Sequence, residues 1–247
     1  MKVSAGFCSF TEITDPAEHR SYNEWHQLDH LPEQLTLDGI AWGERWVASP
    51  ACRAAWTVAP PFDPIHYLTL YLLTGPVEPA LAEFAALAVD LRAVDRFHRH
   101  RRAAVSGAFD VVACAVAPRV LVSAAAVPYR PNRGIHVRVD EPAPDAHLAW
   151  LEADHLPALA AVDGVAGAWA FRQRTTGTDP RPTTADRAVT IAWLDDPPLD
   201  VAPRIAALPG APPTAVRTLL AGPLEHIEPH RWNWFERPAP GAGEETA

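Results

Sequence analysis

A motif that occurs twice, 125 residues apart, limits most strongly how this chain can fold. Shifting the 247-residue sequence by that distance aligns the segment from Trp25 with the segment from Trp150. Eight of 22 aligned positions are identical without a gap, and the shared pattern is W-x3-D-H-L-P-x5-D-G-[IV]-A. Self-similarity at a fixed spacing is typical of a duplicated structural unit, so the sequence predicts two similar units in tandem.

Strand-like and helical runs surround both copies of the motif in the same order. Each half has a strand before the motif, two strands after it, a second helical stretch and a last strand. In the first half these runs are 2–10, 40–48, 66–73, 78–94 and 108–117; in the second they are 133–139, 165–173, 188–194, 197–209 and 218–228. The order predicts an α+β chain of two βαββαβ, or ferredoxin-like, units.

Each such unit covers one face of its sheet with two helices and leaves the other face apolar and open. Two units in one chain can close these faces against each other, which predicts a single-chain, pseudo-dimeric α/β barrel with a cavity. We expect a first unit over 1–121, a linker over 122–133 and a second unit over 134–236. The Pro/Gly-rich tail 237–247 is predicted to be disordered.

Composition excludes several other classes of protein. The formal charge of −9 gives no electrostatic case for binding nucleic acid, and the basic run 96–102 is interpreted as a solvated helix end. Three cysteines without a CxxC spacing indicate a reducing compartment rather than a disulfide or zinc framework. With no signal-like N-terminus and no apolar run of 18 residues, the expected location is the cytoplasm, with no membrane partner.

The duplicated pattern resembles the dimeric α/β-barrel superfamily, and most of all its EthD-like and related uncharacterised branches. The resemblance rests on the motif helix, with W-x3-D-H-L-P-E, and on the D-G turn and R-W of the strand that follows. It covers both halves, but it implies only a fold with a cavity, because the superfamily includes oxygenases, cyclases, isomerases, decarboxylases, haem proteins and ligand-sensing domains. A further dimer of the single-chain barrel is possible.

His26, His30 and Glu33 share one side of the motif helix, in the outline of a two-histidine, one-carboxylate metal site. Pro32 interrupts the helix before Glu33, and the second half has leucine and alanine at the positions of His26 and Glu33. We therefore expect no metal and no other cofactor. The three residues remain candidates for catalysis by proton transfer, for which histidine is the usual group.

His30 has two interpretations, because Asp29-His30 recurs as Asp154-His155. It could close the helix against the sheet through a backbone carbonyl, or it could line the cavity as a general acid or base. The residues that do not recur favour a main site in the first half. They are His26, Glu33, Trp42, Glu44, Arg45 and Trp46.

Strand alternation separates polar faces from apolar ones, and we expect the polar faces to line the barrel cavity. The predicted substrate-binding residues are Trp42, Arg45, Trp46, Tyr67, Thr69, Tyr71, His136 and Arg138. The predicted function is cofactor-independent acid–base chemistry on a hydrophobic, aromatic or polyketide-like substrate: dehydration, cyclisation, isomerisation or decarboxylation. The alternatives are a cofactor-free monooxygenase and a protein that binds a hydrophobic ligand without turnover.

Overall fold

The computed structural model describes residues 2–174, 185–210 and 215–236, so the predicted tail 237–247 lies outside the described residues. The first half consists of β1 (Val3–Ile13), α1 (His19–Trp25), α2 (Leu31–Gln34), β2 (Ile40–Val47), α3 (Pro50–Ala54), β3 (Thr57–Val58), β4 (Tyr67–Thr74), α4 (Val77–Ala93) and β5 (Arg101–Val116). A short helical turn, Ala124–Tyr129, leads to the second half. That half consists of β6 (Gly134–Glu141), α5 (Asp145–Trp150), α6 (Leu156–Ala160), β7 (Val165–Gln173), β8 (Ala188–Leu194), α7 (Pro198–Ala206) and β9 (Arg217–His226).

Eight strands form a closed antiparallel barrel in the order β2-β4-β1-β5-β7-β8-β6-β9, and β9 returns to β2. The two halves have the same internal strand order, because β2-β4-β1-β5 and β7-β8-β6-β9 correspond position by position. They join at two seams, β5 with β7 and β9 with β2. The result is the α+β barrel that the repeat predicts.

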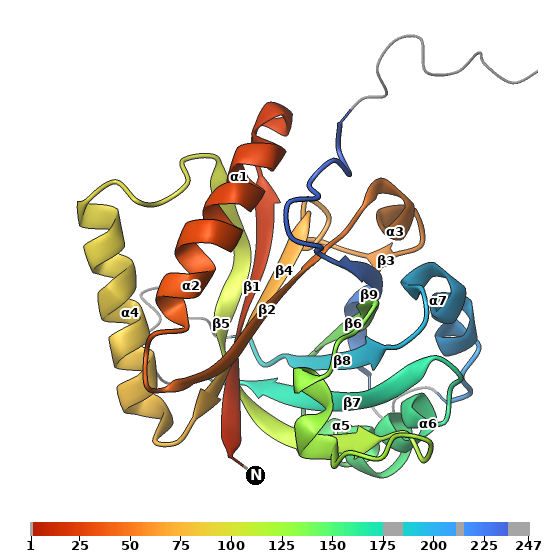
Figure 1. The fold of residues 1–247 in the computed structure, drawn as a ribbon. Coiled ribbons are helices and arrows are strands. Elements are labelled where there is room, and N and C mark those ends of the chain that lie inside the picture. Colours follow the sequence, from red (N-terminus) through yellow and green to blue (C-terminus); the bar gives the residue numbers. More distant parts are fainter. Residues whose placement is uncertain (1, 175–184, 211–214, 237–247) are drawn as a thin grey trace, which may run out of the picture.

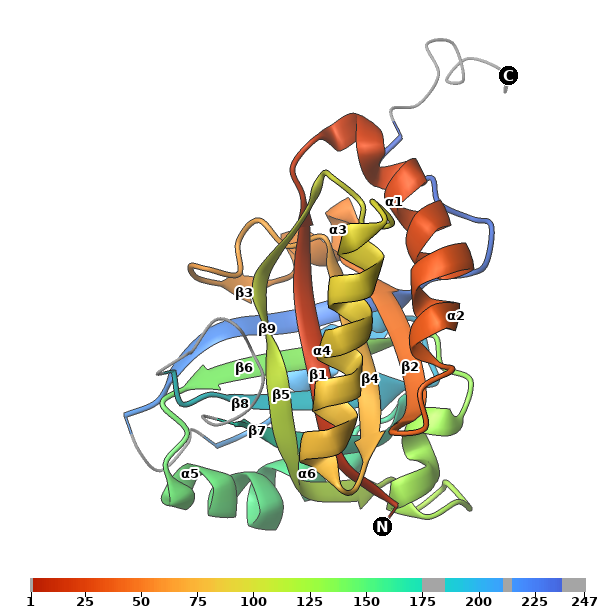
Figure 2. The same cartoon turned by 90° about the vertical axis from the view of Figure 1, so that its left-hand side faces the viewer.

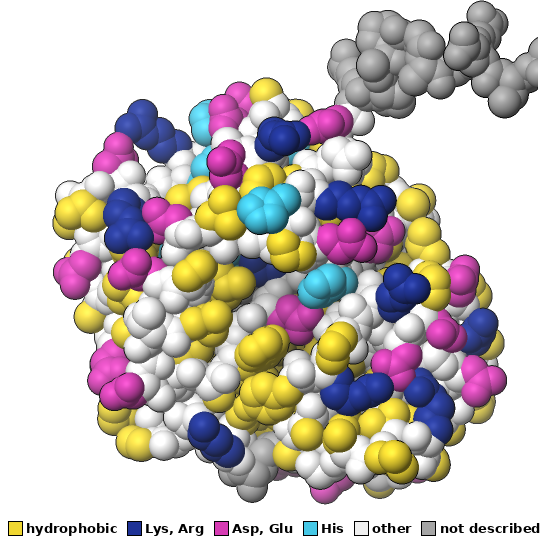
Figure 3. All heavy atoms as spheres, in the orientation of Figure 1, with side chains coloured by type: hydrophobic (Ala, Val, Ile, Leu, Met, Phe, Trp, Pro, Cys, Tyr) yellow, Lys and Arg dark blue, Asp and Glu magenta, His cyan; other side chains and the backbone are white. Residues whose placement is uncertain are grey.

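The helices lie outside the barrel, mostly over the strands of their own half, although α3 packs against β9 and α6 also contacts β5. Helices α1, α2 and α4 lie against the first-half strands, and α5, α6 and α7 lie on the other side of the molecule (Figure 1). Figure 2 shows α4 running along the strands of its own half. In the orientation of Figure 1, the space-filling view shows charged side chains scattered over the face and hydrophobic, acidic and histidine side chains together near its centre (Figure 3).

The barrel interior is filled by bulky apolar side chains from both halves. Its largest members include Phe10, Trp46, Phe109, Trp169 and Trp193, all of them nearly inaccessible to solvent. An eight-stranded barrel is just wide enough for side chains to fill it, so these residues make one core shared by both halves.

The expected orientation of the strand faces is wrong. Leu68, Leu70 and Leu72 of β4 belong to the interior core, whereas Tyr71 packs with residues of α4 and Tyr67 packs with residues of α1. The same holds in β6, whose apolar residues enter the interior core, while His136 and Arg138 line a pocket beneath the second-half helices. The polar faces therefore lie between sheet and helices, because the closed interior is the driest volume in the molecule.

The basic run 96–102 is not a solvated helix end. Helix α4 ends at Ala93, and β5 already begins at Arg101, seven residues before the predicted strand. Arg101 donates through Nη2 to Ser9 Oγ at 3.1 Å, and its guanidinium lies 5.8 Å from the Phe97 ring. Within the described part of the chain, no helix is long and apolar enough to cross a membrane.

Candidate functional site

The first-half polar cluster lies between the outer face of the first-half sheet and helices α1 and α2. A stripe of buried polar side chains at every fourth position faces the sheet from these helices: Tyr22, His26, His30 and Gln34. In a regular α-helix such a stripe drifts by about 40° with each step of four residues. Here residues His26–His30 form a π-turn, closed by the bond from Leu31 N–H to the His26 carbonyl. The wider turn winds less per residue and so offsets the drift.

The π-turn also explains why tryptophan and histidine recur five residues apart. Trp25 stacks on His30 with ring centroids 4.6 Å apart, and Trp150 stacks on His155 at 4.7 Å. The second half has its own π-turn, Leu151–His155, at the equivalent place. Residues i and i+5 become neighbours where the hydrogen bonds run from i to i+5. The recurrent histidine is therefore part of an aromatic stack, and among the described residues neither His30 nor His155 forms a side-chain hydrogen bond to a backbone carbonyl.

Arg45 is the main charge of the first-half polar cluster. It is 4% exposed, and its Nη2 donates to Asn23 Oδ1 at 3.0 Å. Its guanidinium also lies 5.0 Å from the Tyr22 ring and 5.5 Å from the Tyr67 ring. Among the described residues it has no carboxylate partner, and its Nε and Nη1 have no hydrogen-bond partner.

Several other buried polar atoms in the cluster have no hydrogen-bond partner among the described residues. They are Tyr22 Oη, His26 Nδ1, His30 Nδ1, both side-chain amide atoms of Gln34, Thr69 Oγ1 and Tyr71 Oη. Most buried polar groups in proteins are paired, so a concentration of unpaired ones indicates a site that binds a ligand or water.

Burial keeps the histidines of the cluster neutral. Burial, with the nearby charges of Arg101 and Arg45, lowers the pKa of His30 to about 3. Burial, followed by the charge of Arg45, also lowers the pKa of His26 well below its ordinary value. Burial raises the pKa of the Tyr71 phenol, so it is uncharged at neutral pH as well. The cluster thus combines positive arginines with neutral imidazoles and phenols.

Glu33 lies outside the cluster, contrary to its expected place beside the histidines. Its side chain is 38% exposed and forms an ion pair with Arg96 at 3.0 Å. Asp29 binds the same arginine at 2.6 Å. Among the described residues, the group with ligand atoms close enough for a metal ion is Asp15, Glu18 and His100, which contains none of the residues of the H-x3-H-x2-E outline.

Trp42 and Trp46 also lie apart from the histidines. Trp46 is buried in the barrel interior, where its Nε1 donates to Asn132 Oδ1 at 3.1 Å. Trp42 is 38% exposed, and its ring lies 5.9 Å from the ring of Tyr129. Both remain predicted substrate-binding residues, but the structure does not bring them to the first-half polar cluster.

His136 and Arg138 lie in the second half, on the opposite side of the barrel. Arg138 donates through Nε to Asp140 Oδ2 at 2.7 Å and through Nη2 to Thr218 Oγ1 at 2.9 Å. Asp140 is 1% exposed, and His147 Nε2 lies 3.2 Å from its Oδ2. Burial is the largest single influence on the pKa of Asp140 and raises it, but the hydrogen bonds from His147, Arg138 and Thr218 and the charge of Arg138 together bring that pKa below its ordinary value.

Strand register shows which residues correspond between the halves. Thr69 lies opposite Arg45 on one side and Ser9 on the other. In the second half, Thr190 of β8 lies opposite Ala170 of β7 on one side and Arg138 of β6 on the other. The arginine is therefore on the second strand of the first unit and on the first strand of the second unit, which a comparison by the 125-residue shift alone does not reveal.

Sequence reasoning missed Tyr22, Asn23, Gln34 and Arg101. The stripe of polar residues at every fourth position was a signal for Tyr22 and Gln34, since it extends H-x3-H by one step in each direction. No sequence signal identified Asn23 or Arg101, because each reaches the cluster only through tertiary packing.

No protein-family model matches the chain, and no curated protein sequence matches it. Solved structures do resemble it. An anthrone oxidase-like protein shares 12% identity at a TM-score of 0.51, with 92% of each chain covered. A candidate monooxygenase from Fusobacterium nucleatum shares 9% identity at 0.54, covering 92% of this chain and 94% of that one. The fold is that of a dimeric α/β barrel.

A third similar structure is the encapsulated DyP-type peroxidase from Mycobacterium smegmatis. It shares 11% identity at a TM-score of 0.53, with 97% of this chain and 96% of that chain covered. At such identities the likeness establishes the fold alone, and the function depends on the chain's own residues.

Proposed function

We propose that this chain is a small-molecule enzyme whose first half performs acid–base chemistry on a hydrophobic, aromatic or polyketide-like carbonyl compound. The observation that carries the proposal is Arg45, a buried guanidinium without a carboxylate partner among the described residues, beside two neutral histidines. A buried charge is costly unless it is paired. The missing partner is an anionic oxygen of the ligand, either a carboxylate or an enolate formed during the reaction.

The reaction step uses groups already placed in the cluster. A neutral imidazole, His26 or His30, removes a proton from the carbon or hydroxyl next to a carbonyl group. The unpaired Nδ1 atoms are the acceptors, and Arg45 stabilises the oxygen as it becomes negative. The anion also favours the protonated imidazole, because it offsets the arginine charge that lowers the histidine pKa. Such a step begins a dehydration, cyclisation or isomerisation.

Cofactor-free oxygenation is the second candidate, because it begins with the same deprotonation. A resonance-stabilised carbanion then reacts with molecular oxygen. Two of the similar structures have names that refer to oxidation or oxygenation, an anthrone oxidase-like protein and a candidate monooxygenase. The apolar, aromatic surroundings of the histidines, with Trp25 stacked on His30, suit a planar substrate.

Anthrone separates the two reactions, because its methylene group is acidic and its oxidation consumes one O₂ and yields anthraquinone and water. Under nitrogen in D₂O, an acid–base enzyme speeds deuterium incorporation at the methylene, measured by NMR. In air, an oxygenase also forms anthraquinone, measured by absorbance. We expect His26→Gln, His30→Gln and Arg45→Met to lower the enzymatic rate by about a hundredfold or more. The exposed His230→Gln is the matched control.

Calorimetry with 2-naphthoate tests the anionic site without requiring turnover. We expect binding that Arg45→Met weakens by about tenfold or more, while His230→Gln leaves it unchanged. If the protein neither binds 2-naphthoate nor changes the fate of anthrone beyond the protein-free rate, the proposed function is wrong.

The finer family assignment is also a proposal. We infer that the halves are tandem ferredoxin-like units that arose by duplication and that they are related to the EthD-like branch. The shared strand order, the paired π-turns and the two Trp–His stacks support this inference.

A further inference from the structure

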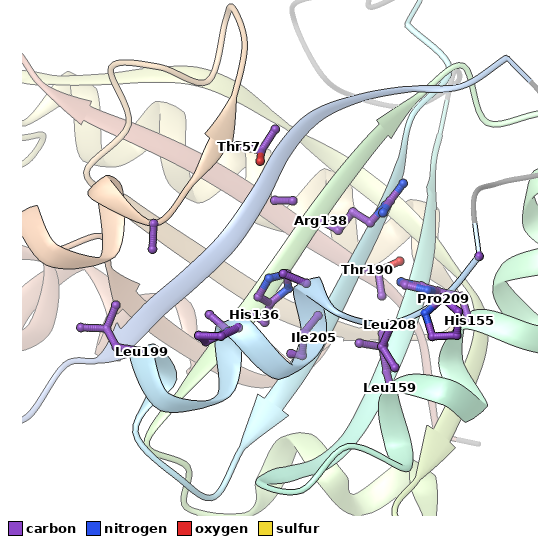
Figure 4. Close-up of a pocket in the computed structure, with 16 residues that line it drawn as sticks. Thr57, His136, Arg138, His155, Leu159, Thr190, Leu199, Ile205, Leu208 and Pro209 are labelled. Carbon is purple, nitrogen blue, oxygen red and sulfur yellow. The ribbon is translucent and has the colours of Figure 1, made fainter.

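A cavity of about 390 Å³ lies mainly in the second half, between the outer face of the sheet and helices α6 and α7, with Ala55 and Thr57 of the first half at its border. Figure 4 shows His136, Arg138 and Thr190 on the strands, with His155, Leu159, Leu208 and Pro209 grouped together toward the right of the view. Its volume is within the range of about 300–1,000 Å³ that is typical of small-molecule sites.

The shortness of α7 explains why the sheet is open here. In the first half, α4 covers the equivalent sheet face with 17 residues, whereas α7 has nine. The chain leaves α7 through 207–210, and Leu208, Pro209 and Gly210 line the cavity in place of further helical turns. A missing length of helix leaves both apolar and polar side chains of the strands uncovered.

The polar groups of the cavity come from strands β6 and β8 and from the π-turn before α6. Thr190 is 3% exposed, and its Oγ1 has no hydrogen-bond partner among the described residues. His136 and His155 line the same cavity. A buried hydroxyl without a partner loses free energy unless something in the cavity bonds to it. Apolar side chains of α6 and α7, including Leu159, Leu199 and Ile205, line the rest of the cavity.

The charges of this cavity are balanced within the protein, unlike those of the first-half polar cluster. Asp140 accepts a hydrogen bond from Arg138 Nε at 2.7 Å, so the arginine among the described residues of the cavity already has its carboxylate. Burial, with the neighbouring His155 and Arg138, lowers the pKa of His136 to about 3. Burial, with Arg138, likewise lowers the pKa of His155 to about 4. The cavity offers hydrogen bonds without net charge.

We propose that the cavity beneath α7 is a second, separate binding site that takes an uncharged aromatic alcohol or ketone. The aromatic part lies against α7 and Leu159, and its oxygen bonds to Thr190 and to a histidine ring. Anionic ligands are disfavoured, because the described residues that line the cavity include no unpaired cation to replace the lost hydration of an anion. This site does not depend on the function proposed for the first half.

Titration calorimetry with 2-naphthol and 2-naphthoate tests the site on the full chain. Ala206→Trp places an indole in the cavity, because Ala206 lines it from the exposed side of α7. Ala207→Trp is the matched control, since Ala207 is equally exposed at the end of α7 but does not line the cavity. We expect Ala206→Trp to weaken 2-naphthol binding by about tenfold or more and Ala207→Trp to leave it unchanged.

Thr190→Val gives a second test that does not depend on how a large side chain is accommodated. Valine keeps the shape and removes the unpaired hydroxyl, so the melting temperature is expected to rise while 2-naphthol binding weakens. A purely structural threonine would show no loss of binding. Absence of saturable 2-naphthol binding, or equal binding by the wild type, Ala206→Trp and Thr190→Val, overturns the proposal. Tighter binding of 2-naphthoate than of 2-naphthol at this site overturns the preference for uncharged ligands.

Discussion

Arg45 and Arg138 both lie on the helix side of the sheet, yet their charges are balanced differently. Arg138 binds Asp140, and the pair is further held by Thr218. Within the described part of the chain, the guanidinium of Arg45 contacts the amide oxygen of Asn23 and two aromatic rings, with no carboxylate bonded to it. One carboxylate, present in one half and absent from the other, therefore separates a neutral site from a site that attracts anions.

The buried histidines make stability depend on pH. The pKa of His30 is about 3 in the folded chain and near 6.5 when unfolded, so the unfolded chain binds the proton first. The stabilisation is present above about pH 6.5 and is lost as the pH falls towards 3. Urea unfolding at about pH 7.5 and about pH 5.5 measures the loss, and His30→Gln should reduce it by about 1 kcal/mol.

The exposed His230→Gln is the control for this measurement, and it should leave the pH dependence as it is in the wild type. If His30→Gln loses as much stability as the wild type between about pH 7.5 and about pH 5.5, His30 has an ordinary pKa in the folded protein.

The π-turns are the elements that turn a repeated motif into a repeated arrangement of side chains. Pro32 and Pro157 lie two residues beyond the ends of the turns, in α2 and α6. Proline lacks an N–H and its ring crowds the carbonyl four residues earlier. A wider turn just before the proline relieves this crowding, and it also stacks each tryptophan on its histidine. The sequence showed the recurrence of the proline, but the π-turn was not predicted.

Deleting one residue from a π-turn should convert it to an α-turn and rotate the preceding helix by about 100° relative to the following one. Leu28 and Ala153 are exposed and occupy equivalent positions in the two turns. We expect deletion of Leu28 to weaken 2-naphthoate binding and to leave 2-naphthol binding intact. Deletion of Ala153, which moves His155 relative to its strand neighbours, should do the reverse. Calorimetry with both ligands measures the effects, and equal losses in both variants would contradict the assignment of separate sites.

At the scale of the whole molecule, the two halves share one core. Trp169 of the second half lies in the same interior cluster as Phe10 and Leu70 of the first. Neither half could bury these side chains alone, because each sheet has one face covered by its own helices and the other by the opposite half. The barrel should therefore unfold in a single cooperative transition.

Scanning calorimetry tests this expectation, because the calorimetric and van't Hoff enthalpies of unfolding are equal when a protein unfolds in a single cooperative transition. We expect one transition, and we expect Trp169→Ala to lower the free energy of unfolding by about 3–5 kcal/mol while unfolding stays cooperative. Trp42→Ala is the matched control, because Trp42 is 38% exposed and its removal should cost much less. Two separate transitions, or a Trp169→Ala effect limited to one of them, would contradict a shared core.

The internal repeat and its surrounding runs were enough to predict the α+β barrel, because duplication, strand alternation and helix periodicity are local features of the sequence. They also identified His26 and His30 as candidate catalytic residues and Arg45 and Tyr71 as candidate substrate-binding residues. Strand alternation could separate two faces but could not say which one turns inward, since both faces are buried in this fold. Only the closed barrel decided that leucines fill the interior and that the polar faces meet the helices. Tertiary packing also placed Glu33 outside the first-half polar cluster and brought Arg101 to that cluster. It divided the predicted site between the first half and the second-half cavity. These outcomes depend on contacts between residues far apart in the chain.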